Sequence, residues 1–371
     1  MKEYLKKHLI NYRGKKINER ILVIESDDWG SIRIPNISVQ SKLLDLGFIK
    51  NEDPFSKYDC LESAEDFETL YTVLQQFKDD KGNSPVITAN MVMANPDFPK
   101  IEQSGFKNYY FEHFTKTYKN YYPKLKTFEA LKKGIENGFI YPQFHTREHL
   151  NIQRWMDKLT SGDIAFRSGF QLKCFAVDDS DDSNRRGNIL ATYDYINNKE
   201  LKSIQSGIEE GLQLFKDTFN FNSYTHIAPC YVWNEFIEET VRKAGVYGVQ
   251  GSKFQQYKDP NSGNHIRLWR YMGQVNKHHQ IYTIRNVLFE PALNQGINWV
   301  DKAMESIAIA FFWKKPAIIG SHRINYVGGL SEANRDNTLV QLDELISRVL
   351  KKWPNVQFLN SEQLAKKLLH A

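Results

Sequence analysis

Short apolar runs alternate with stretches of helical periodicity along the chain. Eight runs have the composition of buried strands: 21–26, 85–90, 138–144, 224–228, 246–250, 280–284, 317–320 and 356–359. Apolar runs of this length, bounded by turn residues, are typical of strands buried on both faces. Strands that alternate with helices predict a parallel sheet. Eight of them favour a closed or nearly closed barrel, with an open doubly wound sheet as the alternative.

Helical spacing fills several of the intervals between these runs. Apolar residues recur at helical spacing between Phe67 and Phe77, and Ser63 begins a capping-box pattern just before them. A second stripe begins at Phe128 and is closed by Gly138, which suits a helix C-cap. Further helices are predicted over 233–244, 300–312 and 334–352.

Two long segments interrupt this alternation. Residues 31–62 and 91–124 show neither pattern, so we expect irregular insertions after the first and second strands. The whole chain, 1–371, is expected to form one barrel domain with its core over about 20–368. The second insertion is rich in aromatic residues. They could stack on sugar rings, but a local hydrophobic core is the favoured interpretation.

Composition excludes several classes of protein. The net charge of +5 is mild and the lysines are dispersed, which gives little support for a nucleic-acid partner. No apolar segment is long enough to span a bilayer. The basic N-terminus is followed by no apolar signal region, so a cytoplasmic location is expected. Three widely spaced cysteines form no disulfide framework, and no P-loop or dinucleotide-binding motif occurs.

Polar residues with catalytic chemistry follow the predicted strands. Asp27 and Asp28 end the first run, and His145 stands at a strand end with His149 expected one helical turn later. Because the carboxyl ends of barrel strands open on one face, these side chains are expected to meet. Two histidines and one aspartate can hold a divalent metal, and the other aspartate can accept a proton from water. His322 follows another apolar run and would share this rim as a general acid.

Other strand ends carry residues with supporting chemistry. Asn90 and Pro229 each follow an apolar run, and backbone amides near Tyr231 could form an oxyanion hole.

These motifs resemble those of the polysaccharide deacetylase family, also called carbohydrate esterase family four or the NodB-homology domain. Glu25-Ser26-Asp27-Asp28 is similar to the family's Thr-Phe-Asp-Asp motif. His145-Thr146-Arg147-Glu148-His149 matches its His-Ser/Thr-x-x-His motif in full. Ile319-Gly320-Ser321-His322 is a looser match to its Leu-x-His motif. The resemblance covers about residues 20–368 in outline and implies a distorted (β/α)7–8 barrel.

The resemblance also assigns roles to individual residues. Asp28, His145 and His149 would hold a divalent metal, Zn²⁺ in the first instance. Asp27 would be the general base, and His322 would be the acid that protonates the leaving amine.

The family's third motif, Arg-x-Pro-Phe/Tyr, is incomplete in this chain. The matching residues are Ile227-Ala228-Pro229-Cys230, which lack the arginine that orients the catalytic aspartate. An ionised Asp27 beside Asp28 needs a positive neighbour, because like charges raise the pKa of a carboxyl group.

Three arginines could replace the missing one. Arg285 is the first choice because it ends an apolar strand, and Arg323 and Arg33 are the alternatives. Glu290 and Asn286 are expected to hold the guanidinium of Arg285 in place.

The leading hypothesis is a metal-dependent hydrolase that removes N-acetyl groups from an amino sugar of a polysaccharide or its precursor. An O-deacetylase or a non-sugar amide hydrolase would use the same residues. A catalytically degenerate carbohydrate-binding protein of polysaccharide assembly is the alternative from another class, but the presence of both aspartates and both histidines argues against it. The lack of a signal favours a nucleotide- or lipid-linked precursor as the substrate.

Overall fold

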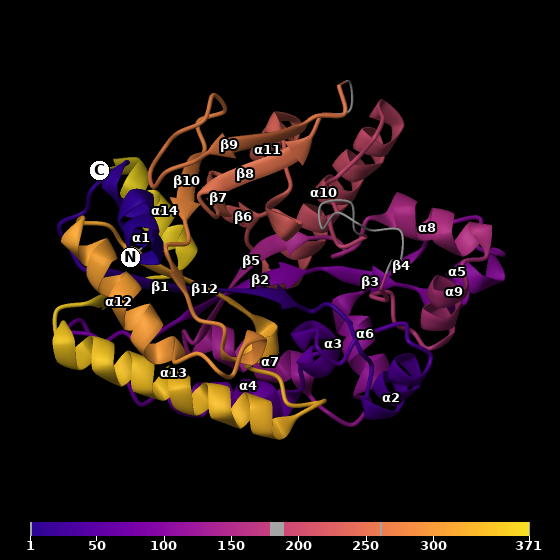
Figure 1. The fold of residues 1–371 in the computed structure, drawn as a ribbon, viewed down its shortest axis with the longest axis horizontal. Coiled ribbons are helices and arrows are strands. Elements are labelled where there is room, and N and C mark those ends of the chain that lie inside the picture. The colour runs from indigo at the N-terminus through magenta and orange to yellow at the C-terminus, as the bar shows by residue number, and fades with distance from the viewer. Residues whose placement is uncertain (1, 179–188, 260–261, 371) are drawn as a thin grey trace.

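The predicted strands assemble into one parallel sheet in a computed structural model that describes residues 2–178, 189–259 and 262–370 (Figure 1). Nine strands run in the order β10-β7-β6-β5-β2-β1-β12-β11, with β13 paired to the start of β1. Their bounds are β1 Ile21–Trp29, β2 Ile87–Val92, β5 Ile140–Thr146, β6 Thr225–Ile227, β7 Gly248–Gly251, β10 Ile281–Ile284, β11 Val287–Leu288, β12 Ala317–His322 and β13 Gln357–Phe358. All eight predicted runs enter this sheet, and β11 is the member that the pattern did not predict.

The two edges of the sheet are joined directly by the chain. β10 pairs with β7 at one edge and β11 pairs with β12 at the other. Only Arg285 and Asn286 separate β10 from β11, so the two edges must lie next to each other. The strand order given above has eight strands, and it has seven if β10 and β11 are counted as one interrupted strand. The distorted (β/α)7–8 barrel is therefore confirmed, and the open doubly wound sheet is wrong.

The predicted helices lie outside this sheet. They are α4 Ala64–Leu74, α7 Thr127–Glu136, α11 Glu235–Lys243, α12 Trp299–Phe312 and α13 Glu332–Lys352. The capping box at the start of α4 is confirmed, because Ser63 and Asp66 exchange side chain-to-backbone hydrogen bonds. Gly138 follows α7 with φ +73°, as a C-capping glycine should. The pattern missed α1 Lys2–Tyr12, α8 Ile152–Ser161, α9 Ile164–Gln171 and α10 Asn198–Phe219, and α14 Ser361–His370 ends the chain.

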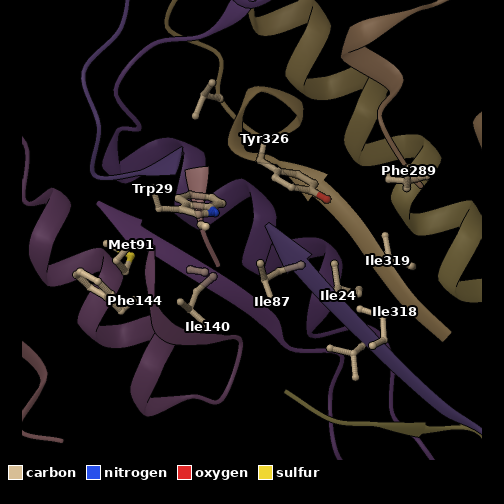
Figure 2. Close-up of a cluster of buried hydrophobic side chains, with 14 of the residues drawn as sticks. Ile24, Trp29, Ile87, Met91, Ile140, Phe144, Phe289, Ile318, Ile319 and Tyr326 are labelled. Atoms are coloured by element: carbon tan, nitrogen blue, oxygen red, sulfur yellow. The ribbon is translucent and has the colours of Figure 1, made fainter. Parts of the chain in front are cut away.

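The hydrophobic core surrounds the central strands (Figure 2). Ile24, Ile87, Ile140 and Ile319 come from four different strands and are almost fully buried. Trp29 stacks on Tyr326 with ring centroids 6.3 Å apart. Each such side chain contributes about 1.5–3 kcal/mol by leaving water. The apolar parts of the strands thus form the core of the barrel, and the polar residues lie at the strand ends.

The two insertions are not irregular, and that prediction is wrong. They contain α2 Ile37–Asp45, α3 Pro54–Tyr58, β3 Ala94–Pro96, α5 Phe98–Gln103, β4 Phe111–His113 and α6 Phe114–Tyr121. Asn36, Asp53 and Asp97 cap the N-termini of three of these helices. Such short helices depend on caps and packing, so they leave little periodicity in the sequence. Phe114 and Tyr118 are buried, which supports the local hydrophobic core.

Among the residues that the structure describes, none of the helices combines the length and the apolar character that crossing a bilayer requires.

Candidate active site

Both carboxylates of the site come from the irregular end of β1. The pairing of β1 with β2 changes register between Ser26 and Trp29. Within this bulge Asp28 has φ +76°, in the left-handed region that residues other than glycine rarely adopt. Adjacent residues of a regular strand point to opposite faces. The bulge instead brings both Asp27 and Asp28 to the wall of one pocket.

Asp28 lies between the two histidines of the predicted metal site. Its Oδ1 atom is 3.4 Å from Nε2 of His145 and 3.4 Å from Nε2 of His149. The three ligand atoms lie within 4.8 Å of one another. His149 is not on a helix as expected, because residues 147–150 form a loop before α8. The loop still turns both imidazoles toward the same carboxylate.

The chemistry of these three side chains fits a divalent cation. Asp28 Oδ1 is buried and accepts no hydrogen bond from any residue that the structure describes. The Nδ1 atom of His145 lies 2.8 Å from the carbonyl oxygen of Ile227, which leaves Nε2 for a metal. Burial lowers the pKa of His149 to about 4 against the opposing effect of Asp28, so this imidazole is neutral at pH 7. Metal binding requires neutral histidine and an ionised carboxylate.

Replacing His145 by alanine is expected to abolish binding of a divalent metal, because the remaining two side chains cannot hold it tightly. Elemental analysis of purified protein after dialysis against Zn²⁺ would measure this. The control is His113→Ala, because His113 lies in β4 and hydrogen-bonds Thr115 and Thr218 away from the pocket. Equal metal content in the two variants would contradict the site.

The strained conformation of Asp28 predicts a gain in stability when this residue is removed. Asp28→Gly should raise the free energy of unfolding of the EDTA-treated protein at pH 8 by about 1 kcal/mol. Glycine adopts φ +76° without strain, and it removes a buried carboxylate oxygen that accepts no hydrogen bond within the described residues. Chemical denaturation of the metal-free proteins would measure the difference. A less stable glycine variant would show that Asp28 is not strained.

Arg285 is the arginine that contacts Asp27. Its Nη1 and Nη2 atoms donate to the two carboxylate oxygens at 2.6 and 2.7 Å. Asn90 donates a further hydrogen bond to Asp27 at 2.8 Å. Burial raises the pKa of Asp27, but the charge and hydrogen bonds of Arg285 outweigh it and lower this pKa to about 2. Asp27 is therefore ionised at neutral pH.

The other two arginines lie elsewhere. Arg323 is fully buried and donates to Asp59 and Glu62. Arg33 lies at the pocket wall, 3.8 Å from Asp59, with its guanidinium over the ring of Phe55.

The prediction that Glu290 and Asn286 hold the guanidinium of Arg285 is wrong. Asn286 donates to Asn11 and to the carbonyl of Pro316, and Glu290 contacts His322 instead. Glu25 holds the guanidinium in place instead, because Arg285 Nε donates a hydrogen bond to its carboxylate at 2.7 Å. The sequence carried a signal for this residue: Glu25 is a charged residue inside an otherwise apolar run, two positions before Asp27 and hence on the same strand face.

Gly320 makes room for the Arg285 side chain. It lies opposite Glu25 in the pairing of β1 with β12. A Cβ atom at this position would be 2.7 Å from Cδ of Arg285. The guanidinium thus reaches β1 by passing over a residue that has no side chain.

Glu290 holds His322 beside Asp27. The Nδ1 atom of His322 is 2.6 Å from Glu290 Oε1, and its Nε2 atom is 3.8 Å from Asp27 Oδ2. Burial lowers the pKa of His322, but Glu290 and then Asp27 and Asp28 outweigh it and raise this pKa to about 10. The imidazole is therefore protonated at neutral pH, as a general acid requires.

The backbone amide of Tyr231 itself does not point to a free oxyanion hole, because it already has a partner. Pro229–Tyr231 forms a 3₁₀ turn in which the amide of Tyr231 donates to the carbonyl of Ala228 at 3.0 Å. Cys230 and Tyr231 have φ +55° and +56°, a pair of left-handed residues that the sequence did not signal. The phenol of Tyr231 instead accepts a hydrogen bond from Arg285 at 3.2 Å.

The proposed metal ligands, Asp27 and His322 line one pocket of about 770 Å³. Asp27, Asp28 and the three histidines lie on one part of its wall, and the rest includes Phe55, Tyr231, Val232 and Leu293. Pockets of this size bind small molecules, and an apolar wall with a few polar groups suits a sugar ring that must be oriented.

No protein-family model matches the chain, and no curated protein matches it. Among solved structures, a probable polysaccharide deacetylase from Pseudomonas aeruginosa PAO1 is similar over 94% of this chain and 91% of its own, with 9% sequence identity and a TM-score of 0.49. For PuuE allantoinase the coverage is 96% and 95%, the identity 9% and the TM-score 0.48.

A third similar structure is the 4-alpha-glucanotransferase of Thermococcus litoralis, with 10% identity and a TM-score of 0.44. The match includes 95% of this chain, which spans 41% of the length of that protein. Several other similar structures are named polysaccharide or peptidoglycan deacetylases. At these scores the function proposed below rests on the geometry of the site.

Proposed function

We propose that the protein is a metal-dependent hydrolase that removes the acetyl group from the nitrogen of an amino sugar. One observation carries the proposal. The Asp28, His145 and His149 cluster adjoins an aspartate held ionised by Arg285 and a histidine held protonated by Glu290. A cation site, a proton acceptor and a proton donor are the three parts that amide hydrolysis needs. Two histidines and a carboxylate are typical ligands of catalytic Zn²⁺, which we propose as the metal.

The residues divide the reaction between them. When bound, the metal would polarise the acetyl carbonyl and lower the pKa of the attacking water. Asp27 would accept a proton as the water oxygen forms its bond to the acetyl carbon. His322 would give its Nε2 proton to the nitrogen as the carbon–nitrogen bond breaks. The products are acetate and the free amine of the sugar.

The placement of the two proton-transferring groups supports this division. Only 3.8 Å separates Asp27 Oδ2 from His322 Nε2, so one substrate group can contact both. The bidentate contact with Arg285 fixes the orientation of the Asp27 carboxylate, and Glu290 orients the imidazole. Pre-positioned groups of this kind lower the entropic cost of reaching the transition state.

Acetate release from N-acetylated and O-acetylated sugars would test the proposal. The protein should release acetate from an N-acetylated substrate, lose this activity in EDTA and regain it with Zn²⁺. Preferential turnover of the O-acetyl ester would identify an O-deacetylase, and turnover of acetylated non-sugar amines alone would identify another amide hydrolase. Sugar binding without turnover by the metal-loaded protein would identify a carbohydrate-binding protein.

Glu290→Gln is expected to move the alkaline limb of the pH–rate profile downward by about one pH unit or more. The wild-type pKa of His322 is raised to about 10 with Glu290 as its main charged cause. Without that charge the imidazole loses its proton at a lower pH, and the general acid is lost earlier. Measurements of kcat/KM against pH would show this.

Two controls separate this effect from a general loss of structure. Glu290→Asp keeps a negative charge near the imidazole and should restore part of the shift. Glu344→Gln removes an exposed carboxylate that pairs with Arg348 and should leave the limb in place. An unchanged limb in Glu290→Gln would show that His322 is not the group titrating there.

A further inference from the structure

A second groove adjoins the active-site pocket. It has a volume of about 480 Å³ and lies between the N-terminal helix α1, strand β8 (Phe254–Lys258), helix α12 and the chain that links β10 to β11. Figure 1 shows α1 beside α12, and the hairpin of β8 and β9 (His265–Trp269) above the barrel strands. Tyr231 and Gln256 line both the groove and the pocket. A molecule bound across them would therefore reach from the catalytic groups into the groove.

Basic residues outnumber acidic residues in the lining of the groove. Its basic residues are Lys6, Lys7, Lys253, Arg267, Arg285 and Lys302, and its one acidic lining residue is Glu3.

Half of these cations are already neutralised by carboxylates. Arg285 pairs with Glu25 and Asp27, Lys7 pairs with Glu305, and Lys302 lies 3.5 Å from Glu3.

The remaining three cations lack a carboxylate partner among the described residues. Within the described part of the chain, neither Lys6, Lys253 nor Arg267 forms an ion pair with a carboxylate. Arg267 belongs to β9 (His265–Trp269) and lies opposite Gln256 of β8. Its guanidinium is 3.6 Å from the centroid of the Phe254 ring, and the Lys253 amine is 5.4 Å from the same centroid.

These three cations are close enough to affect one another. Burial lowers the pKa of Lys253, and the charges of Lys6 and Arg267 lower this pKa further. Lys6 and Arg267 are exposed, so water screens part of this repulsion, and an anion bound between the three cations would remove more of it.

We propose that this groove binds the phosphoryl part of the substrate, and that the substrate is an acetylated amino sugar attached to a phosphate or diphosphate. The proposal rests on the function proposed above and names the class of substrate. Arginine and lysine bind phosphate oxygens through charge-assisted hydrogen bonds. Ile10, Phe254 and the half-exposed Leu288 line the same groove and offer apolar surface for the group that carries the phosphate.

Titration of the metal-free, full-length protein with inorganic pyrophosphate tests the anion site without reference to activity. Lys253→Gln and Arg267→Gln should each weaken binding about tenfold, because each removes one charge-assisted contact. Lys258→Gln is the matched control, because Lys258 lies on the same strand β8 but outside the groove. Equal affinity in wild type and all three variants, or no pyrophosphate binding at all, would overturn the proposal.

Kinetics with matched substrates test the link to the active site. The Zn²⁺-loaded enzyme should turn over a nucleoside-diphosphate-linked or a polyprenyl-diphosphate-linked N-acetyl amino sugar at least about tenfold better, in kcat/KM, than the neutral methyl glycoside. Lys253→Gln and Arg267→Gln should lose this preference and keep the rate on the neutral glycoside. The better of the two diphosphates identifies the carrier, and either one supports the proposal.

The outcomes separate this inference from the function on which it rests. If the neutral glycoside is the better substrate, the hydrolase function stands and the phosphate-bearing substrate is wrong. If no acetylated sugar is hydrolysed but pyrophosphate binding depends on Lys253 and Arg267, the hydrolase function is wrong and the anion site stands.

Discussion

Asp27→Asn should reduce the turnover number by about a hundredfold or more, because general-base catalysis is worth at least that much. Asparagine has the same shape but cannot accept the proton of the attacking water. Asp27 is not a ligand of the proposed cation, so the variant should bind as much metal as the wild type. Steady-state kinetics and elemental analysis of the same preparation would measure both effects.

Glu62→Gln is the control for the loss of a buried carboxylate. Glu62 is fully buried and pairs with Arg323, as Asp27 pairs with Arg285, but it does not line the pocket. This control should lower stability without a comparable loss of turnover in the folded protein. Near-normal turnover in Asp27→Asn would remove Asp27 from the mechanism, and loss of metal would reassign it as a ligand.

Arg285→Met should destabilise the protein by about 3–5 kcal/mol at pH 8, because it leaves the buried Glu25 without a counter-charge and leaves Asp27 with His322 as its remaining cationic neighbour. In the wild type the pKa of Asp27 is about 2, below its value in the unfolded chain, so this group stabilises the fold above the unfolded pKa. Without Arg285, burial and the charge of Glu25 would raise the pKa of Asp27 above the unfolded value. The stability difference from wild type should then be larger at pH 8 than at pH 5, which denaturation at both pH values would measure.

The same substitution should move the acidic limb of the pH–rate profile upward, because Asp27 would be protonated at a higher pH. Arg323→Met is the matched control: Arg323 is also fully buried between two carboxylates, Asp59 and Glu62, without contacting Asp27. This control should lose a similar amount of stability and keep the acidic limb where it is. An unmoved limb in Arg285→Met would mean that Asp27 does not titrate in that limb.

The barrel was predictable because most of its strands are continuous apolar runs. Burial on both faces leaves an unmistakable composition at 21–26 and 317–320. The element that closes the barrel was not predictable in the same way. β11 has two residues, Val287 and Leu288, and the second is half exposed, so it lacks both the length and the composition of a strand.

The candidate site was predictable wherever a residue directly ends a strand. Asp27, His145 and His322 come together because the carboxyl ends of parallel strands share one face. The choice of Arg285 follows the same rule.

What the sequence did not reveal depends on local backbone conformation and on distant pairing. Nothing in the residue types of Asp28 or Tyr231 signals the left-handed conformation that each adopts. The contact between Glu290 and His322 joins residues 32 positions apart and is set by the loop between β11 and α12.

The short segment between β10 and β11 closes the barrel, and it also carries the arginine that orients the Asp27 carboxylate. Arg285 occupies this junction of β10 and β11: its amide donates a hydrogen bond to the carbonyl of Gly251 in β7, and its side chain lies over Gly320 in β12. A motion that breaks the strand pairing at this junction is therefore expected to pull the guanidinium away from Asp27 as well. A barrel that has lost the strand pairing at this junction is therefore expected to lose the proposed activity as well.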